Sequence, residues 1–186
     1  MMKKSKKWLA TAAAATLLVG TLLAGTLAYF QDTEHKVNTF TTGKVDIELI
    51  EPDFDKLEDE DKILVPGREI KKDPTVVVKA NSEDSYVRAT VTIPSALEPL
   101  LEDLTLGTGW SFDNDYYYYA GKVAKSNTDT YLPAIFNHIQ VKTSVINDQM
   151  AALTAADLDI TVHAFAIQAE GFTDAAAAWA AYTYTP

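Results

Sequence analysis

The sequence predicts an all-β protein, an antiparallel β-sandwich with one or two short helices, which follows an N-terminal signal helix. Two observations indicate the fold class. Seven or eight short segments with strand-like patterns recur along the chain, and turn residues separate them at roughly even spacing. A third observation sets the first thirty residues apart, because a basic cluster there precedes a long apolar run.

The N-terminus has the pattern of a secretory signal peptide. An uncharged run from Trp8 to Leu27 follows the basic cluster, and the chain then turns polar at once. Thr26 and Ala28 are small enough for the −3 and −1 pockets of a signal peptidase, so we expect cleavage after Ala28, with Tyr29 as the alternative. The basic cluster consists of Lys3, Lys4, Lys6 and Lys7.

An uncleaved membrane anchor is the competing interpretation, because an apolar run of about 20 residues can span a bilayer as a helix. Cleavage is favoured, since no basic stop-transfer cluster follows the run. The expected organisation is a signal peptide over 1–28, a flexible mature N-terminus over 29–42 and a β-sandwich domain over 43–186. The mature protein is expected to be secreted, to the extracellular matrix or the cell surface.

The expected strands differ in where their apolar residues lie. Segments 44–50 and 86–93 alternate between apolar and polar residues, which predicts half-buried strands. Segment 69–79 contains Pro74, which cannot donate to a ladder, so this strand starts there or lies at an edge. Segment 159–169 is apolar on both faces, which predicts a central strand. The other expected strands are 116–119, with two tyrosines on each face, and 135–145.

Two segments have the spacing of short helices. Leucines recur at intervals of three and four residues in 95–104, although Pro99 limits the regularity of this helix. A last helix is expected over 175–181, with Trp179 as its anchor. Its N-cap is expected to be Thr173 or Asp174. The residues expected to face the core of the sandwich include Val87, Val91, Ile160 and Val162.

Composition limits the functional classes. After removal of 28 residues the chain has 158 residues, enough for one domain with a core. It then carries 12 basic residues (16 less the four lysines) and 26 acidic residues, a net charge of −14. This balance argues against nucleic acid and anionic membranes as partners. The chain has no cysteine, which removes thiol catalysis, disulfides and cysteine zinc sites.

Six short motifs occur in order along most of the chain: GTLAYFQDT (25–33), NTFTTGKVDI (38–47), PG (66–67), DPTV (73–76), YVR (86–88) and AIQA (166–169). In this order and spacing they resemble the TasA/camelysin family of exported Gram-positive proteins. The resemblance implies processing by a signal peptidase of the SipW type and a jelly-roll topology. It also implies assembly into extracellular matrix fibres, in which the N-terminus of one subunit completes the sheet of the next. Part of the family carries a camelysin metallopeptidase label.

No segment has the spacing of a known catalytic, cofactor or metal site. His35, His138 and His163 are not in a His-Glu-x-x-His helix, although adjacent strands could bring His138 and His163 together. The acidic loop 53–61 offers oxygens to calcium but lacks the glycine and ligand spacing of an EF-hand loop. We therefore expect no catalytic residue and no cofactor. Calcium and zinc are the possible ligands, but the spacing of the motifs does not support a site for either.

The favoured function is a structural subunit of biofilm-matrix fibres that polymerises head to tail with itself. Segment 29–42 is the candidate donor strand, with Tyr29, Phe30 and Val37 as its anchors. The other expected partner is the signal peptidase during export, and contact with a membrane is expected only through the uncleaved signal. Two alternatives stay open: a metal-dependent endopeptidase, and a surface-anchored module that binds carbohydrate or protein, for which the four tyrosines could form a platform.

Overall fold

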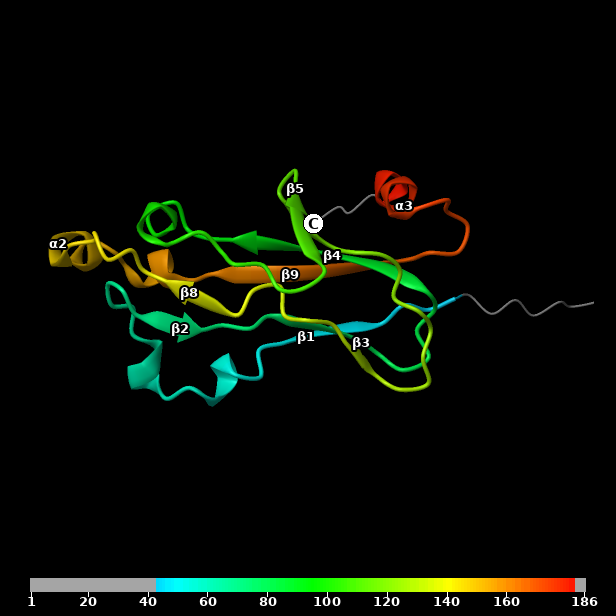
Figure 1. Ribbon diagram of the computed structural model, residues 1–186, viewed down its shortest axis with the longest axis horizontal. Helices are drawn as coiled ribbons and strands as arrows, with labels where there is room; N and C mark the ends of the chain where they lie inside the picture. The colour runs from blue at the N-terminus through cyan, green and yellow to red at the C-terminus, as the bar shows by residue number, and fades with distance from the viewer. Residues whose placement is uncertain (1–42, 183–186) are drawn as a thin grey trace, which may run out of the picture. The chain divides into compact units, whose positions relative to one another are not determined.

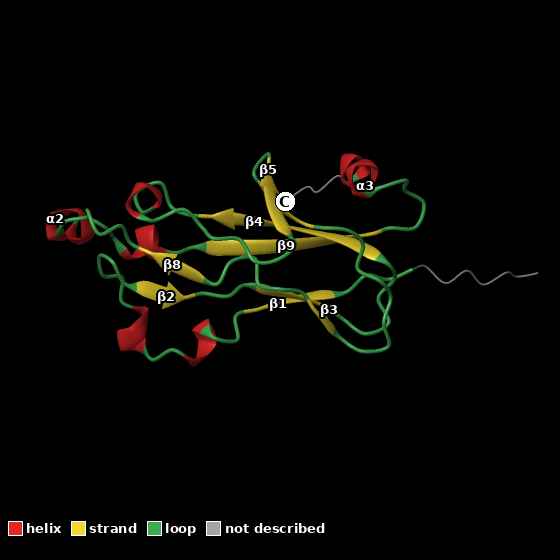
Figure 2. Ribbon diagram, viewed as in Figure 1, coloured by secondary structure: helices red, strands yellow, loops and turns green. Residues whose placement is uncertain are grey.

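The structure, a computed structural model, describes residues 43–182. The described residues belong to one compact unit. The predicted signal peptide, its cleavage site at Ala28 or Tyr29, and the assembly residues Phe30 and Val37 lie outside the described residues. Strands stack in two layers (Figures 1 and 2), and all named strand pairs are antiparallel. The all-β prediction is confirmed, while the jelly-roll topology stays an expectation.

The lower layer in Figure 1 contains two sheets that are joined end to end. Backbone hydrogen bonds connect them, because Ile135 donates to the carbonyl of Pro74 over 2.8 Å and Lys72 donates to that of Asn137 over 3.3 Å. Together they form one long ladder. The first sheet has the order β1 (Ile47–Ile50), β3 (Thr75–Val78), β7 (Thr130–Tyr131), and the second pairs β2 (Glu69–Lys71) with β8 (His138–Gln140).

Two prolines explain why this ladder is interrupted. Pro74 separates β2 from β3, as its position in the sequence predicted. Ile70 pairs with Ile139, and Val77 pairs with Tyr131. Between these two pairs the chain advances by seven residues from β2 to β3 and by eight residues from β7 to β8. The extra residue is a β-bulge near Pro133. The predicted strand over 135–145 is therefore wrong in extent, and its alternation holds only in part: Ile135, Ile139, Val141 and Val145 are buried, but so is Phe136, while Asn137 and Thr143 are exposed.

The upper layer is one sheet with the order β5 (Trp110–Asp113), β6 (Tyr116–Tyr119), β4 (Ser85–Thr92), β9 (Thr161–Gln168). Asn114 and Asp115 connect β5 to β6 with φ angles of 46° and 68°, the signature of a two-residue type I′ hairpin. The core lies between the layers. On β4, Val87 and Ala89 point into it and are at most 1% exposed, as predicted.

The helical segments are short. The expected helix over 95–104 is wrong, because only Glu98–Leu100 forms a 3-10 turn (η3), and Pro99 inside the segment cannot donate the amide hydrogen bond of a longer helix. Its leucines nevertheless close one end of the sandwich in a cluster with Val141 and Val145. The other segments are η1 (Phe54–Lys56), η2 (Asp59–Lys62), α2 (Asn147–Ala151), which the sequence did not predict, and η4 (Ala155–Leu158).

The last helix, α3 (Ala175–Ala181), is confirmed with its cap, since the Asp174 carboxylate accepts the amide of Ala177 over 2.8 Å. Trp179 is 8% exposed and anchors α3 on the outer face of the upper sheet. No helix within residues 43–182 has the length and apolar character needed to cross a membrane.

The prediction that segment 159–169 forms a central strand is wrong. β9 lies at the edge of its sheet and pairs only with β4. It is apolar on both faces because the core covers one face and the α3 region covers the other. Its outer edge has no strand partner among residues 43–182, and this combination defines the candidate site.

Candidate functional site

The outer edge of β9 has no neighbouring strand among residues 43–182, although β9 has the sequence of a central strand. Its eight residues, TVHAFAIQ, include no lysine, aspartate, glutamate or proline. Edge strands are usually protected by such residues or by a bulge. Among the described strands β1 pairs only with β3, and it lies beside β9. The edges of the two layers therefore meet along β1 and β9, and no described strand connects them. We call this feature the β1–β9 seam.

Burial along β9 indicates that the seam is open. Val162, Ala164 and Ala166 point toward the core but are only partly buried, whereas Val87 and Ala89 on the neighbouring β4 are at most 1% exposed. The two strands have similar apolar side chains, so the difference comes from the missing neighbour on one side of β9. A further strand along this edge would complete the burial.

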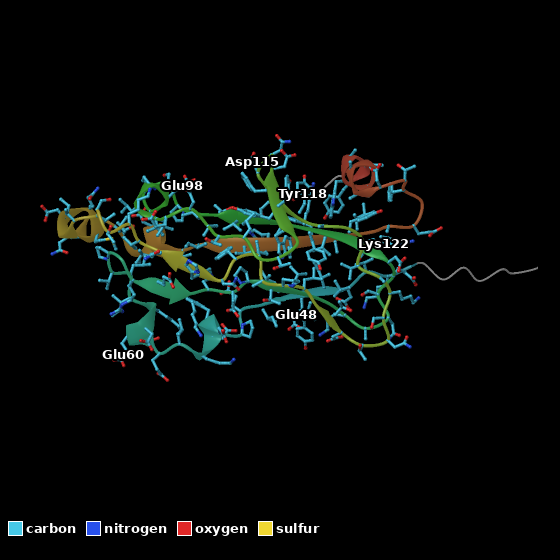
Figure 3. The ribbon with its side chains drawn as sticks, viewed as in Figure 1. Glu48, Glu60, Glu98, Asp115, Tyr118 and Lys122 are labelled. Carbon is cyan, nitrogen blue, oxygen red and sulfur yellow. The ribbon has the colours of Figure 1, made fainter. Side chains whose placement is uncertain are left out.

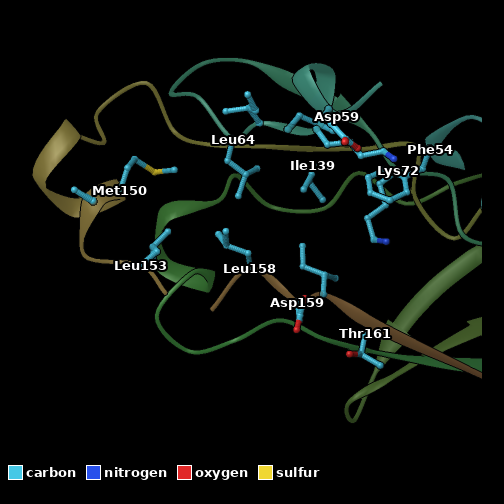
Figure 4. Close-up of a pocket in the computed structure, with 15 residues that line it drawn as sticks. Phe54, Asp59, Leu64, Lys72, Ile139, Met150, Leu153, Leu158, Asp159 and Thr161 are labelled. Carbon is cyan, nitrogen blue, oxygen red and sulfur yellow. The ribbon is translucent and has the colours of Figure 1, made fainter. Parts of the chain in front are cut away.

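A cavity of about 890 Å³ lies at the Thr161 end of the seam (Figure 4). Apolar side chains from β2, β8, α2, η4 and the start of β9 line most of it, and they point inward from both layers. Leu158 is 47% exposed and Ile63 is 56% exposed, so the mouth of this seam pocket is itself apolar. Its main apolar lining is Ile63, Leu64, Ile139, Met150, Leu153 and Leu158.

The floor of the pocket is held by a buried ion pair. The Lys72 ammonium lies 2.8 Å from a Glu51 carboxylate oxygen and 4.7 Å from the Phe54 ring centroid. The Asp73 carboxylate accepts the backbone amides of Asp53 and Phe54 at 3.0 to 3.1 Å. These contacts fix the chain after β1, so this wall of the pocket is built before any partner arrives.

The Gln168 end of the seam is polar, and ion pairs lie near it within each of the two layers. Lys79 bridges Asp129 at 2.6 Å and Glu48 at 3.1 Å, and hydrogen bonds to these carboxylates raise the pKa of Lys79. Asp84 pairs with Lys122 and accepts the amide of Lys125, which lowers the pKa of Asp84. Figure 3 marks Glu48 and Lys122 in this half of the domain. The two ends of the seam therefore differ in chemistry: the Thr161 end is largely apolar and the Gln168 end is charged.

The outer face of the upper sheet holds a buried cation. Arg88 is 8% exposed, and its guanidinium lies 3.9 Å from the Tyr116 ring centroid and 4.2 Å from that of Trp179. Phe165 and Tyr182 complete the group at 5.8 and 5.3 Å. Sequence reasoning placed Arg88 on the face away from the core and did not foresee that α3 covers this face.

The candidate metal residues are not brought together. His138 is in β8 of the lower layer and His163 is in β9 of the upper sheet, so they do not occupy adjacent strands. The acidic loop 53–61 forms η1 and η2 instead of a single ligand cage. Within residues 43–182 no group of three or more His, Asp or Glu side chains is placed to hold a metal ion. The third histidine, His35, lies outside this part of the chain.

The four tyrosines do not form a common platform. Tyr117 and Tyr119 pack against the core, while Tyr116 and Tyr118 lie on the outer face, where Tyr116 contacts Arg88. The sequence indicated this alternation. The sequence analysis did not predict the seam pocket. The features that could have indicated it are the uncharged strand at 161–168 and the two leucines that precede it, Leu153 and Leu158.

One family model matches this chain: residues 3–80 match the family described as camelysin metallo-endopeptidase. The matched part includes β1, β2, β3 and the pocket wall around Phe54, but not β9. No curated protein and no solved structure matches the chain. The family match is consistent with the resemblance that the six motifs indicate, and through residues 3–80 it relates this chain to the TasA/camelysin family.

Proposed function

We propose that this protein is a secreted structural subunit that polymerises into extracellular fibres by strand addition. The position of β9 at the edge of its sheet, among the strands of residues 43–182, is the observation that carries the proposal, because an uncharged eight-residue edge strand is a template for another chain. A heterologous contact of this kind does not close on itself and produces an open filament.

The proposed donor is segment 29–42 of a neighbouring copy. When it is extended, the charged residues Asp32, Glu34 and Lys36 lie on one face. The opposite face carries Tyr29 and Val37, which are the side chains available to cover the inward residues of β9. Phe30 projects on the charged face and is suited to a contact outside the core.

Export controls when the donor becomes available in this proposal. Segment 29–42 directly follows the predicted signal peptide, so its N-terminal end is freed only when that peptide is removed after Ala28 or Tyr29. Assembly would then begin outside the cell. N-terminal sequencing of native surface material should give a chain that begins at Tyr29 or Phe30, whereas an intact Met1 in membranes would contradict this step.

Electron microscopy of two purified chains tests the proposal. The chain that starts at Tyr29 should form filaments, and salt should speed their growth because it screens the net charge of −14 derived above. The chain that starts at Gly43 should stay monomeric. A double substitution, Phe30→Asp with Val37→Asp, is the matched control, since it should weaken assembly and leave the unfolding transition of the domain unchanged. Identical filaments from the Gly43 chain would contradict the proposal.

A metal-dependent endopeptidase is the second candidate, and the description of the matched family favours it. Its active site would require residues beyond those that the structure describes, since residues 43–182 contain no cluster suited to a metal. Zinc analysis of the purified mature protein separates the two functions. Stoichiometric zinc, lost together with proteolysis in His138→Ala and in His163→Ala, would favour the enzyme.

A further inference from the structure

We propose that the seam pocket binds a small amphiphile that has a single aliphatic chain and a zwitterionic head group. The proposal goes beyond the proposed function, because it concerns a ligand of the individual domain and does not depend on fibre formation. The pocket has a suitable size: its volume of about 890 Å³ lies within the range of about 300 to 1,000 Å³ that is usual for small-molecule sites.

The lining of the pocket changes from apolar to polar along its length. Figure 4 shows apolar side chains toward one end: Leu64, Met150 and Leu153. Toward the other end it shows charged and hydroxyl side chains: Asp59, Lys72, Asp159 and Thr161. Because both ends belong to one cavity, a ligand that fills it needs an apolar part and a polar part.

The apolar end suits a flexible aliphatic chain. Ile70 and Ile139 lie deep in the pocket and are 2% and 7% exposed, whereas Leu158 at the mouth is 47% exposed. A chain that covers Leu158 removes apolar surface from water, which is favourable. The Met150 side chain has three rotatable bonds and can adapt to the shape of the chain.

The aromatic content of the lining argues against a planar ring as the apolar part. Among the described residues that line the pocket, Phe54 is the aromatic one. Its ring centroid already has the Lys72 ammonium at 4.7 Å and the Lys62 ammonium at 5.3 Å. Ring stacking therefore has no suitable place in the pocket, while an alkyl chain needs only the aliphatic side chains at the other end.

Two lysines and two aspartates line the polar end, and both signs of charge constrain the head group. Lys72 is neutralised by Glu51, whose carboxylate lies 2.8 Å from the ammonium. The ion pairs within residues 43–182 do not include Lys62, Asp59 or Asp159. One positive and two negative charges in the described lining are therefore available to a ligand.

These three charges lie on two walls. Asp59 and Lys62 are the first and last residues of η2, and side chains three residues apart in a 3-10 turn project in the same direction. Asp159 follows η4 and lies on the other side of the pocket in Figure 4. A head group between the walls thus meets Lys62 and Asp59 on one side and Asp159 on the other.

This arrangement selects a head group that carries both signs of charge. An anionic head would be repelled by Asp59 and Asp159, and a cationic head would leave Lys62 without a counter-ion. A zwitterion satisfies both walls when its anionic group contacts Lys62 and its cationic group contacts Asp159. The inferred ligand class is therefore a single-chain zwitterionic amphiphile.

Calorimetric titration of the chain that starts at Tyr29 tests this inference with four probes that share a decyl chain, each used below its micelle concentration. The probes are decylphosphocholine, decyl maltoside, decyl sulfate and decyltrimethylammonium. We expect decylphosphocholine to bind at one molecule per chain and about fivefold more tightly than each of the others. Its octyl analogue should bind more weakly, by about fourfold for each methylene removed.

Two neighbouring alanines at the end of α2 locate the site. Ala151 and Ala152 are both exposed, but only Ala151 lines the pocket. Ala151→Trp should reduce the affinity for decylphosphocholine at least about tenfold, because the indole occupies the place of the alkyl chain. Ala152→Trp is the matched control and should bind as the unmodified chain does. Equal affinity in the two variants would overturn the pocket assignment.

The head group is tested by Lys62→Gln, which should bring the affinity for decylphosphocholine close to that for decyl maltoside. Asp61→Asn, on the same turn but outside the lining, is the control and should keep the preference for the zwitterion. Equal binding of both probes by the unmodified chain would overturn the zwitterionic head. A dimer in sedimentation that Ala151→Trp abolishes, without binding of any probe, would assign the pocket to a second copy and overturn the inference.

Discussion

The outer face and the outer edge of β9 differ in whether other described residues cover them. The outer face is partly covered within the chain, because α3 lies over it and brings Trp179 and Tyr182 against Arg88 and Phe165. The outer edge has no strand partner within residues 43–182, and the pocket at its Thr161 end is open. The contacts on the outer face stabilise the single domain, and the outer edge is where we propose that a partner binds.

The face under α3 buries a cation that has no carboxylate partner among residues 43–182. Within this part of the chain the Nε atom of Arg88 has no hydrogen-bond acceptor, and four aromatic rings lie around its guanidinium. A guanidinium on aromatic faces is stabilised by the ring quadrupoles and by packing of its stem. Packing and aromatic contacts thus stabilise the buried Arg88 guanidinium in this part of the chain.

The largest expected effect is on the face under α3. Trp179→Ala in the chain that starts at Gly43 should lower the free energy of unfolding by about 3 kcal/mol, since it removes a large buried aromatic side chain. Phe112→Ala is the control, because Phe112 is 57% exposed and should cost much less. Urea unfolding measures both. Equal losses would mean that α3 does not cover this face.

A comparison of two valines tests the open edge. In the Gly43 chain, Val87→Ala should cost about 2 kcal/mol and Val162→Ala about 1, because Val162 is only partly buried. In filaments of the chain that starts at Tyr29, the Val162 side chain becomes fully covered. Val162→Ala should then raise the critical concentration for assembly. A Val162→Ala cost as large as that of Val87→Ala in the monomer would show that the edge is already covered.

Ion pairs at the Gln168 end predict how the stability of the domain depends on pH. The pKa values of Asp84 and Asp129 are lowered from 3.8 by hydrogen bonds to Lys122 and Lys79 respectively, so their contribution is present above about pH 4 and is lost as pH falls through the lowered values. The pKa of Lys79 is raised from 10.5 by Asp129 and Glu48, so its contribution is lost only in strong alkali. Thermal unfolding from pH 7 to pH 2 should show the acid loss, and Asp129→Asn should reduce it. An unchanged acid profile in Asp129→Asn would contradict this assignment.

The smallest effect is expected from exposed positions. Glu48→Ala removes one carboxylate of an exposed pair, and it should change the free energy of unfolding by no more than about 0.5 kcal/mol. Thr90→Ala, on the outer side of β4, is the companion variant. A loss near that of Val87→Ala in either variant would mean that the assignment of faces on these strands is wrong.

The sequence predicted local structure well wherever one residue decided it. Pro74 divided β2 from β3, and Asp174 capped α3. It failed over 95–104, where the leucine spacing suggested a helix that Pro99 prevents. Leucine spacing reports which side chains are buried, and here the burial is real without the helix.

The candidate site was harder to predict because it depends on what is next to β9. A strand that is apolar on both faces is normally central, and periodicity cannot report that one of its edges has no neighbour. Nor can it report that η2, α2 and η4 leave a pocket between the layers, since these segments meet only in the folded chain. The mismatch between the sequence of β9 and its edge position among residues 43–182 is the reason we propose a donor strand there.

Hydrogen exchange along β9 tests most directly whether a neighbouring strand occupies its outer edge. Alternate amides of Thr161–Gln168 point away from β4 and should exchange quickly in the monomeric Gly43 chain. In filaments of the chain that starts at Tyr29, these amides should become strongly protected, while amides at the outer edge of β5 keep their monomer rates. Filaments in which the exchange of Thr161–Gln168 is the same as in the monomer would contradict the account.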